Sequence, residues 1–134
     1  MHIDHIGIAV KDIKSATETY SRILNSKPTK TEVVESEKVE TVFFQTGESK
    51  VELLGPINDD SVIAKYVAKK GEGLHHVAFE VEDIHAELDR LRKEGFTVLN
   101  EQPKDGADNK LVAFVHPKDN NGVLVELCQS KKES

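Results

Sequence analysis

The sequence contains an internal duplication, which constrains its fold more than any other feature. The stretch Ile3–Ile13 recurs 71 positions later as Leu74–Ile84, so that His5 returns as His76. Apolar residues stay apolar at most of the other paired positions. Because one repeat of roughly 65 residues would bury too little surface to be stable alone, we expect the two repeats to share a core.

Each half shows strand-like alternation, then helical spacing, then strand-like alternation again. Asp12 can cap the first helix, and Ser61 and Gly71 bound a short helix between the halves. This order predicts a duplicated α+β fold in a single domain at 1–134. Its parts are module one at about 1–56, a linker helix at 57–72 and module two at about 73–129. We expect strands at 2–10, 38–45, 50–54, 74–81, 96–99, 111–115 and 122–128, and helices at 12–24, 62–70 and 83–94.

Composition excludes several classes of protein. With 37% hydrophobic and 31% charged residues, the chain is typical of a globular domain, and no apolar run approaches the roughly 18 residues of a membrane span. The net charge of −6 argues against non-specific binding of nucleic acid. The single cysteine, Cys128, excludes an internal disulfide, and the start of the chain has no secretory signal, so we expect a cytoplasmic protein.

The duplication also repeats a possible pair of metal ligands. His5 is followed 47 residues later by Glu52, and His76 is followed 50 residues later by Glu126, each Glu within an apolar run. Divalent metals bind neutral imidazole and ionised carboxylate on rigid elements. We therefore predict one metal site formed by His5, Glu52, His76 and Glu126. The alternatives are packed histidines and carboxylates paired with Lys or Arg, because an unpaired buried carboxylate is costly.

The other histidines do not join this pattern. His85 belongs to a helix without a duplicated counterpart, and His116 belongs to a turn at a strand end. His75 points away from His76 by strand parity, although it could reach the edge of the site.

The chain resembles the vicinal oxygen chelate superfamily and, within it, the methylmalonyl-CoA epimerases. The resemblance implies paired βαβββ modules in a cupped, mostly antiparallel sheet around one divalent metal, with cobalt as the first expectation and nickel, manganese or zinc as alternatives. It also implies an acyl-CoA substrate and a homodimer. It covers nearly the whole chain and rests on the segments Ile3–Val10, Val51–Pro56, Ser61–Phe79, His116–Lys118 and Asn121–Gln129.

One position departs from the family. Many epimerases of this kind carry Gln where this chain has Glu52. A carboxylate at this position also matches glyoxalase I, whose metal is commonly held by two His or Gln and two Glu. Glu52 therefore adds negative charge to the predicted site without deciding between these enzymes.

Epimerisation at C2 of a thioester needs stabilisation of the enolate and a base on each face of the carbon. The resemblance points to Glu40 and Glu126 as the bases, with Glu126 also a metal ligand. Glu40 shares a strand face with Val42 and Phe44, and the second module has no carboxylate near Leu111–Ala113. The alternative for Glu40 is an exposed carboxylate at a strand edge.

Three other functions remain open from the sequence. Glyoxalase I is the closest alternative enzyme, although the linker helix and the His116–Lys118 turn favour the epimerase. A non-catalytic binder of the same fold is expected to lose ligands, whereas both His–Glu pairs are present. Ring-cleaving dioxygenases use three ligands and longer chains.

Lys104, Lys110 and Lys118 are candidates to bind CoA by location alone.

Overall fold

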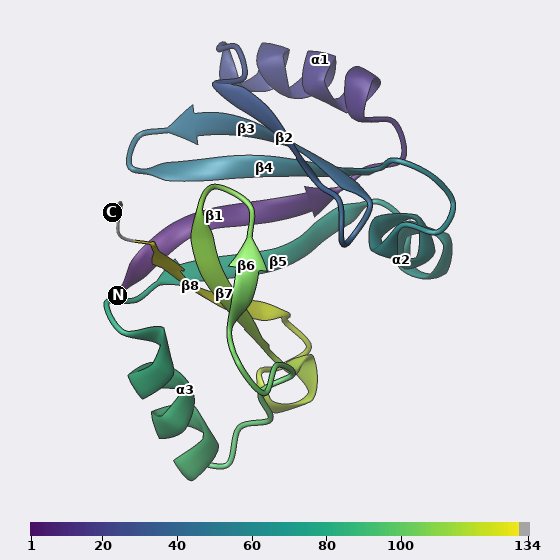
Figure 1. Cartoon of the computed structure of the whole chain (residues 1–134). Helices are drawn as coiled ribbons and strands as arrows, with labels where there is room; N and C mark the ends of the chain where they lie inside the picture. The colour runs from purple at the N-terminus through teal and green to yellow at the C-terminus, as the bar shows by residue number, and fades with distance from the viewer. Residues whose placement is uncertain (132–134) are drawn as a thin grey trace. The chain divides into compact units, whose positions relative to one another are not determined.

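The computed structural model describes residues 1–131, and its element order repeats once (Figure 1). The first repeat runs β1, α1, β2, β3, β4 and the second runs β5, α3, β6, β7, β8, with α2 between them. The predicted α+β class and the duplicated βαβββ order are therefore confirmed. The bounds are β1 His2–Ala9, α1 Ile13–Leu24, β2 Lys30–Val34, β3 Val39–Thr46, β4 Ser49–Pro56, α2 Val62–Lys70, β5 Gly73–Glu80, α3 Ile84–Lys93, β6 Lys104–Gly106, β7 Lys110–Val115 and β8 Val125–Ser130, with a 3-10 turn at Pro117–Asp119.

The chain divides into two compact units that do not coincide with the two repeats. The first unit is His5–His75, and the second unit combines Met1–Asp4 with the chain from His76 onward. Strand β1 therefore gives its first residues to the second unit, and β5 gives its first residues to the first unit.

The first unit contains a sheet in the order β2-β3-β4-β1, antiparallel except for the parallel pair β1 and β4. One face packs under α1, because alternate residues of each strand are apolar and the helix offers an apolar stripe. The opposite face packs at one end against α2, through Ile63 and Val67. The α1 face consists of Ile8, Val10, Val42, Phe44 and Leu53, packed against Ile13, Ala16, Tyr20 and Leu24.

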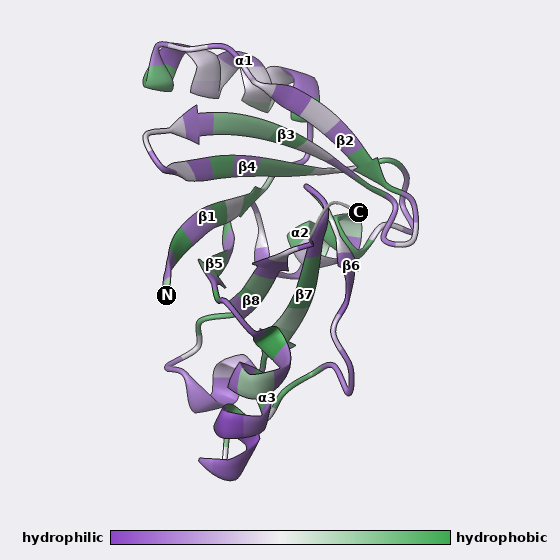
Figure 2. Cartoon of the chain, turned by 60° about the vertical axis from the view of Figure 1, so that its left-hand side comes forward, coloured by the Kyte–Doolittle hydropathy of each residue, from purple (hydrophilic) through white to green (hydrophobic). Residues whose placement is uncertain are grey.

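The second unit contains a sheet in the order β5-β8-β7-β6, in which β5 and β8 are parallel and the other pairs antiparallel. Helix α3 covers one face through Ile84 and Leu88, which pack on Val81, Ala113 and Leu127. Figure 2 shows that α3 is mostly hydrophilic, as expected for a helix that buries only a narrow stripe.

The helix termini follow the expected capping chemistry. The Asp12 carboxylate accepts hydrogen bonds from the amides of Lys14 and Ser15, and the Ser61 hydroxyl accepts one from the amide of Ile63. The helix expected at 62–70, within the linker predicted at 57–72, is observed as α2 over the same residues. No helix among residues 1–131 is long and apolar enough to span a bilayer.

The strand prediction was wrong at three places. Residues 96–99 form a single bridge, from Val98 to Val115, because the amide of Thr97 bonds to the Asp119 carboxylate instead of a neighbouring strand. Strands β2 and β6 were missed. Both are short and lie at the end of their unit's strand order, and most of their residues are charged, small or exposed, so the alternation that marks a half-buried strand is weak.

Candidate metal and proton-transfer site

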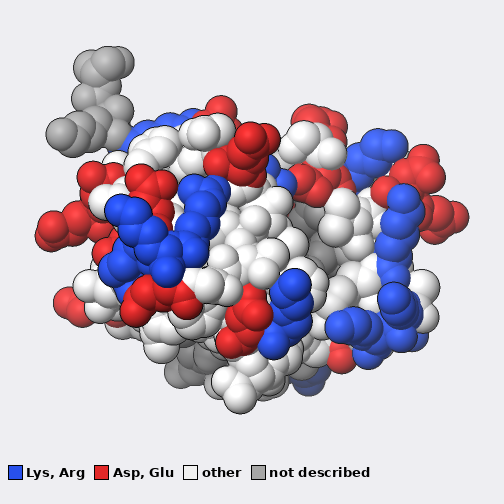
Figure 3. All heavy atoms as spheres, turned by 90° about the horizontal axis from the view of Figure 1, so that it is seen from below, with Lys and Arg blue, Asp and Glu red and all other residues white. Residues whose placement is uncertain are grey.

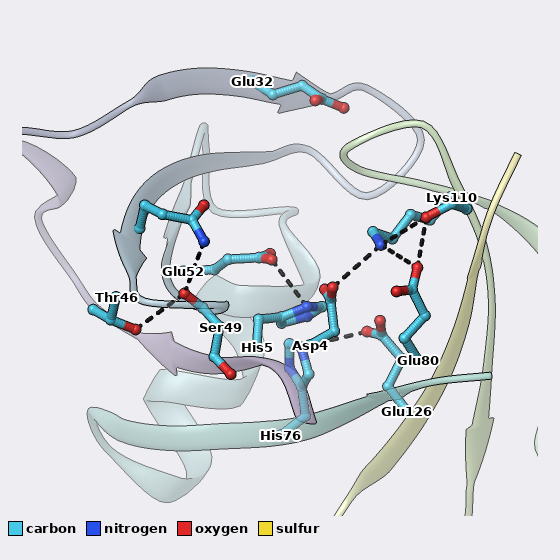
Figure 4. Close-up of polar contacts among 12 residues, drawn as sticks. Asp4, His5, Glu32, Thr46, Ser49, Glu52, His76, Glu80, Lys110 and Glu126 are labelled. Atoms are coloured by element: carbon cyan, nitrogen blue, oxygen red, sulfur yellow. Dashed lines mark hydrogen bonds and ion pairs between the residues drawn. The ribbon is translucent and has the colours of Figure 1, made fainter. Parts of the chain in front are cut away.

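His5 and Glu52 form a buried pair in the first unit. His5 lies on β1 and Glu52 on β4, and the parallel register places Glu52 opposite Gly7 and therefore on the same sheet face as His5. His5 Nδ1 lies 3.0 Å from Glu52 Oε2, with each side chain 6% exposed (Figure 4). The predicted association of these two residues is thus present within this unit.

His76 and Glu126 form the equivalent pair in the second unit. His76 Nε2 on β5 lies 3.3 Å from Glu126 Oε1 on β8, and both side chains are buried. The Phe114 ring meets the His76 imidazole edge-on, with centroids 6.0 Å apart and an interplanar angle of 85°. This contact restrains the orientation of the imidazole.

A phenylalanine accompanies each of the two pairs, and the sequence prediction missed both. In the antiparallel registers Phe43 stands opposite Glu52, and Phe114 stands opposite Glu126. Each half therefore places one His, one Glu and one Phe on a single sheet face. The sequence did carry a signal, because Phe43 and Phe114 are separated by the same 71 positions as the two histidines.

The side chains of both pairs are chemically suited to a divalent metal. A carboxylate out of reach of solvent needs a positive charge or hydrogen-bond donors, and a metal ion supplies the charge when the neighbouring imidazole is neutral. Without a metal, a protonated imidazole fulfils the same need. Imidazole nitrogen and carboxylate oxygen together suit cobalt, nickel, manganese and zinc.

The structure does not bring Glu40 to the His5–Glu52 pair. The β3–β4 register sets Glu40 opposite Gly55 and Phe43 opposite Glu52. Because alternate residues of a strand point to opposite faces, Glu40 lies on the α1 face with Val42 and Phe44, and Glu52 lies on the other face. The register therefore counts against Glu40 as a proton-transfer group beside this pair.

His75 and His116 each have a structural partner of their own. The His75 ring packs edge-on to Tyr66 with centroids 4.6 Å apart, and burial together with nearby Lys70 lowers its pKa. His116 Nδ1 accepts a hydrogen bond from the backbone N–H of Lys118 at 3.0 Å, which ties this imidazole to its own turn.

Lys110 has a different role from the one suggested by its location in the sequence. Its side chain is 7% exposed, and its Nζ donates to Glu80 at 2.8 Å, to Asp4 at 3.2 Å and to Ser130 at 3.2 Å (Figure 4). Burial alone would lower the pKa of Lys110, but its contacts with Glu80 and Asp4 raise it overall. The ammonium is thus engaged inside the second unit and is a poor candidate to bind CoA.

The surface charges are mixed in sign. On the face shown in Figure 3, lysine and arginine side chains are interspersed with aspartate and glutamate. Such a mixed pattern, on a chain with a net charge of −6, gives this face no extended basic surface for a polyanion.

Comparison with known proteins finds one matching family model and several similar proteins. The family model of the Glyoxalase/Bleomycin resistance protein/Dioxygenase superfamily matches residues 4–114. The uncharacterized protein YqjC of Bacillus subtilis is 42% identical, with 96% of this chain and 92% of that protein covered. The ethylmalonyl-CoA/methylmalonyl-CoA epimerase of Cereibacter sphaeroides is 40% identical, with 95% of this chain and 96% of that protein covered.

Among solved structures, a variant of Streptomyces coelicolor methylmalonyl-CoA epimerase in complex with 2-nitronate-propionyl-CoA is similar, with a TM-score of 0.90. Its sequence is 37% identical, and the match covers 98% of this chain and 99% of that one.

Proposed function

The chain belongs to the methylmalonyl-CoA epimerase family of the glyoxalase/bleomycin resistance protein/dioxygenase superfamily, and we propose that it interconverts (2R)- and (2S)-methylmalonyl-CoA. The observation that carries the proposal is the repeated buried His–Glu pair, present in each unit at 3.0 and 3.3 Å. Similarity over nearly the full length of epimerase relatives supports the choice of substrate.

We propose that His5, Glu52, His76 and Glu126 together hold one divalent metal ion. What supports this is the donor chemistry of each pair, its burial and its repetition beside Phe43 and Phe114. When bound, the ion supplies positive charge close to where negative charge develops as the C2 proton leaves. The identity of the metal, with cobalt as the first expectation, stays a prediction.

The protein's own contribution to the reaction is proton transfer at C2. We propose that the Glu126 carboxylate takes this proton, while the C–H electron pair delocalises into the thioester carbonyl. Return of a proton from the other face of the carbon inverts the centre. The second proton-transfer group predicted from the sequence is Glu40, and this role stays a prediction for mutagenesis to decide.

The low exposure of the four proposed ligands bears on how they work. Each is buried to 6% exposure or less, so water competes poorly for the carboxylates, and electrostatic interactions there are strong. The same burial is costly unless the charges are matched, which favours a site that binds a cation.

The predicted homodimer and cytoplasmic location stay predictions.

Deuterium exchange at C2 tests the proposal. The protein is incubated in D2O with a single epimer of methylmalonyl-CoA, with and without a chelator, and deuterium is measured by mass spectrometry. We expect exchange and loss of stereochemical purity, both suppressed by the chelator and restored by adding metal. No exchange, combined with turnover of the methylglyoxal–glutathione adduct, would instead assign glyoxalase I activity. Failure of both reactions would indicate a binding protein.

Metal content provides a readout that does not depend on activity. We expect the wild-type protein to bind about one ion per chain and His5→Ala and His76→Ala each to lower the affinity for it. If one substitution abolishes binding and the other leaves it unchanged, the two pairs do not share an ion.

A further inference from the structure

The face of the first unit that carries His5 and Glu52 extends across all four strands of its sheet. In the successive registers Gly7 stands opposite Glu52, Glu52 opposite Phe43, and Phe43 opposite Lys30. Residues paired in this way point to the same side of a sheet. Lys30, on β2, therefore lies on the same face as the His5–Glu52 pair, in the row of Glu52.

Lys30 is held in place by an aromatic ring. Its Nζ lies 4.9 Å from the centroid of Phe43, a residue with 0% exposure. A cation over an aromatic face is attracted to it, and a buried ring is a fixed platform. The Lys30 side chain is 44% exposed.

Lys30 has an anionic neighbour on its own strand. Its Nζ lies 3.6 Å from Glu32 Oε1 on the same strand, with the Glu32 side chain 34% exposed. An exposed ion pair of this length contributes little free energy, so an anionic ligand on this face would compete with Glu32 for the ammonium. Lysines at sheet edges often serve only to prevent edge pairing. The position of Lys30 over Phe43, on the face of the candidate site, points to a more specific role.

The proposed substrate is an anion, which a cation on this face would attract. Methylmalonyl-CoA carries a free carboxylate and the phosphates of CoA, and the chain that receives it has a net charge of −6 and two proposed ligand carboxylates. Resting on the proposed function, we propose that Lys30 binds an anionic oxygen group of the acyl-CoA substrate. The group is either the carboxylate of the acyl chain or a phosphate of CoA, and both present the same charged oxygens to an ammonium.

Titration calorimetry with methylmalonyl-CoA tests this role without depending on turnover. We expect Lys30→Met to weaken binding about tenfold, Lys30→Arg to stay within about threefold of wild type, and Glu32→Gln to strengthen binding slightly. The matched control is Lys14→Met, which removes the same charge from an exposed position on α1, the helix packed on the opposite face. We expect this control to bind like wild type.

Salt dependence separates a charge contact from a structural effect. We expect added salt to weaken binding to the wild-type protein more steeply than to Lys30→Met, because the lost contact is electrostatic. Equal salt slopes, or an equal loss of affinity in Lys14→Met, would overturn the assignment. Far-ultraviolet circular dichroism and thermal unfolding verify that Lys30→Met is folded.

Two truncated ligands identify the anionic group. Propionyl-CoA lacks the acyl carboxylate, and methylmalonyl-pantetheine lacks the nucleotide phosphates. If the penalty of Lys30→Met disappears only with propionyl-CoA, Lys30 binds the carboxylate; if it disappears only with methylmalonyl-pantetheine, Lys30 binds a phosphate. A penalty that persists with both ligands overturns the proposal. Tight binding without deuterium exchange would refute the proposed function alone, whereas exchange with unaltered binding by Lys30→Met would refute only this inference.

Discussion

The same sheet face is apolar at one end in the first module and ionic at the corresponding positions in the second. In the first, Ala9, Val39 and Leu54 pack with Ile63 and Val67 of α2. In the second, the residues 71 positions after Ala9 and Val39 are Glu80 and Lys110, and these form an ion pair. Positions related by the duplication are thus apolar in the first module and charged in the second, although His, Glu and Phe are retained a few residues away.

The difference shows which positions the duplication left free to diverge. In the first unit α2 supplies apolar side chains to cover the face. In the second unit the cover includes Asp4, whose carboxylate accepts a hydrogen bond from Lys110. A buried ion pair contributes little net stability compared with apolar packing, but losing one partner is costly. The ionic network of Asp4, Glu80 and Lys110 therefore adds little net stability to the second unit, although removing one of its members is costly.

The largest expected effect comes from breaking the ionic network. Lys110→Met leaves Asp4 and Glu80 without their ammonium, and we expect the free energy of unfolding to fall by about 3–5 kcal/mol. Val39→Ala, the matched change in the first module, removes two methyl groups from an apolar cluster and should cost about 1.5 kcal/mol. Urea denaturation measures both. If Lys110→Met lowers the free energy of unfolding no more than Val39→Ala does, the second unit does not depend on the network.

The next effect separates the two carboxylates of the repeated pairs. We expect Glu126→Gln to lower the rate of deuterium exchange by at least about 100-fold, because it removes the proposed base. Glu52→Gln should retain metal and stay within about tenfold of wild type, since Gln is common in this family at that position. Exchange rates and metal content are measured for each variant. Equal losses in the two variants would mean that both halves of the site contribute the same chemistry.

A smaller effect concerns the stability in acid of the ion pair between Glu80 and Lys110. Burial would raise the pKa of Glu80, but hydrogen bonds from Lys110 and Ser130 outweigh it and lower this pKa below the ordinary value of 4.5. The resulting stability is present above that value and is lost as pH falls through the lower folded-state pKa. From about pH 5 to pH 3 we therefore expect the unfolding free energy to fall more steeply in wild type than in Glu80→Gln. Identical slopes would show that Glu80 titrates normally.

The sequence predicted the parts of the molecule that the duplication repeats. The two histidines, the element order and the helix termini follow from local patterns and from the 71-residue offset, and each Glu follows its His at a similar interval of 47 or 50 residues. The Lys110 network does not, because its members are distant: Asp4 and Lys110 lie 106 positions apart, and Glu80 and Lys110 lie 30 apart. Ion pairs of this kind leave no periodic signal in a single sequence. Only the three-dimensional register brings them together.

The position of Glu40 relative to the site also depends on information that the sequence does not contain. The sequence correctly placed Glu40 with Val42 and Phe44, but it could not show which face carries the His5–Glu52 pair. That required the register of three strands, in which Phe43 and not Glu40 stands opposite Glu52. A residue that departs from an internal repeat is therefore a candidate for function only if it also shares the face of the site.

The smallest expected effect accordingly belongs to Glu40. Because strand parity directs the Glu40 side chain to the α1 face and the Glu52 side chain to the other, we expect Glu40→Gln to change the exchange rate by less than about threefold. Metal content should also remain unchanged. A loss of exchange of about 100-fold or more, with metal retained, would establish Glu40 as the second base, as the sequence predicted. It would then require β3 to present Glu40 to the opposite face during the reaction, which amide hydrogen exchange along Val39–Thr46 in the presence of substrate can detect.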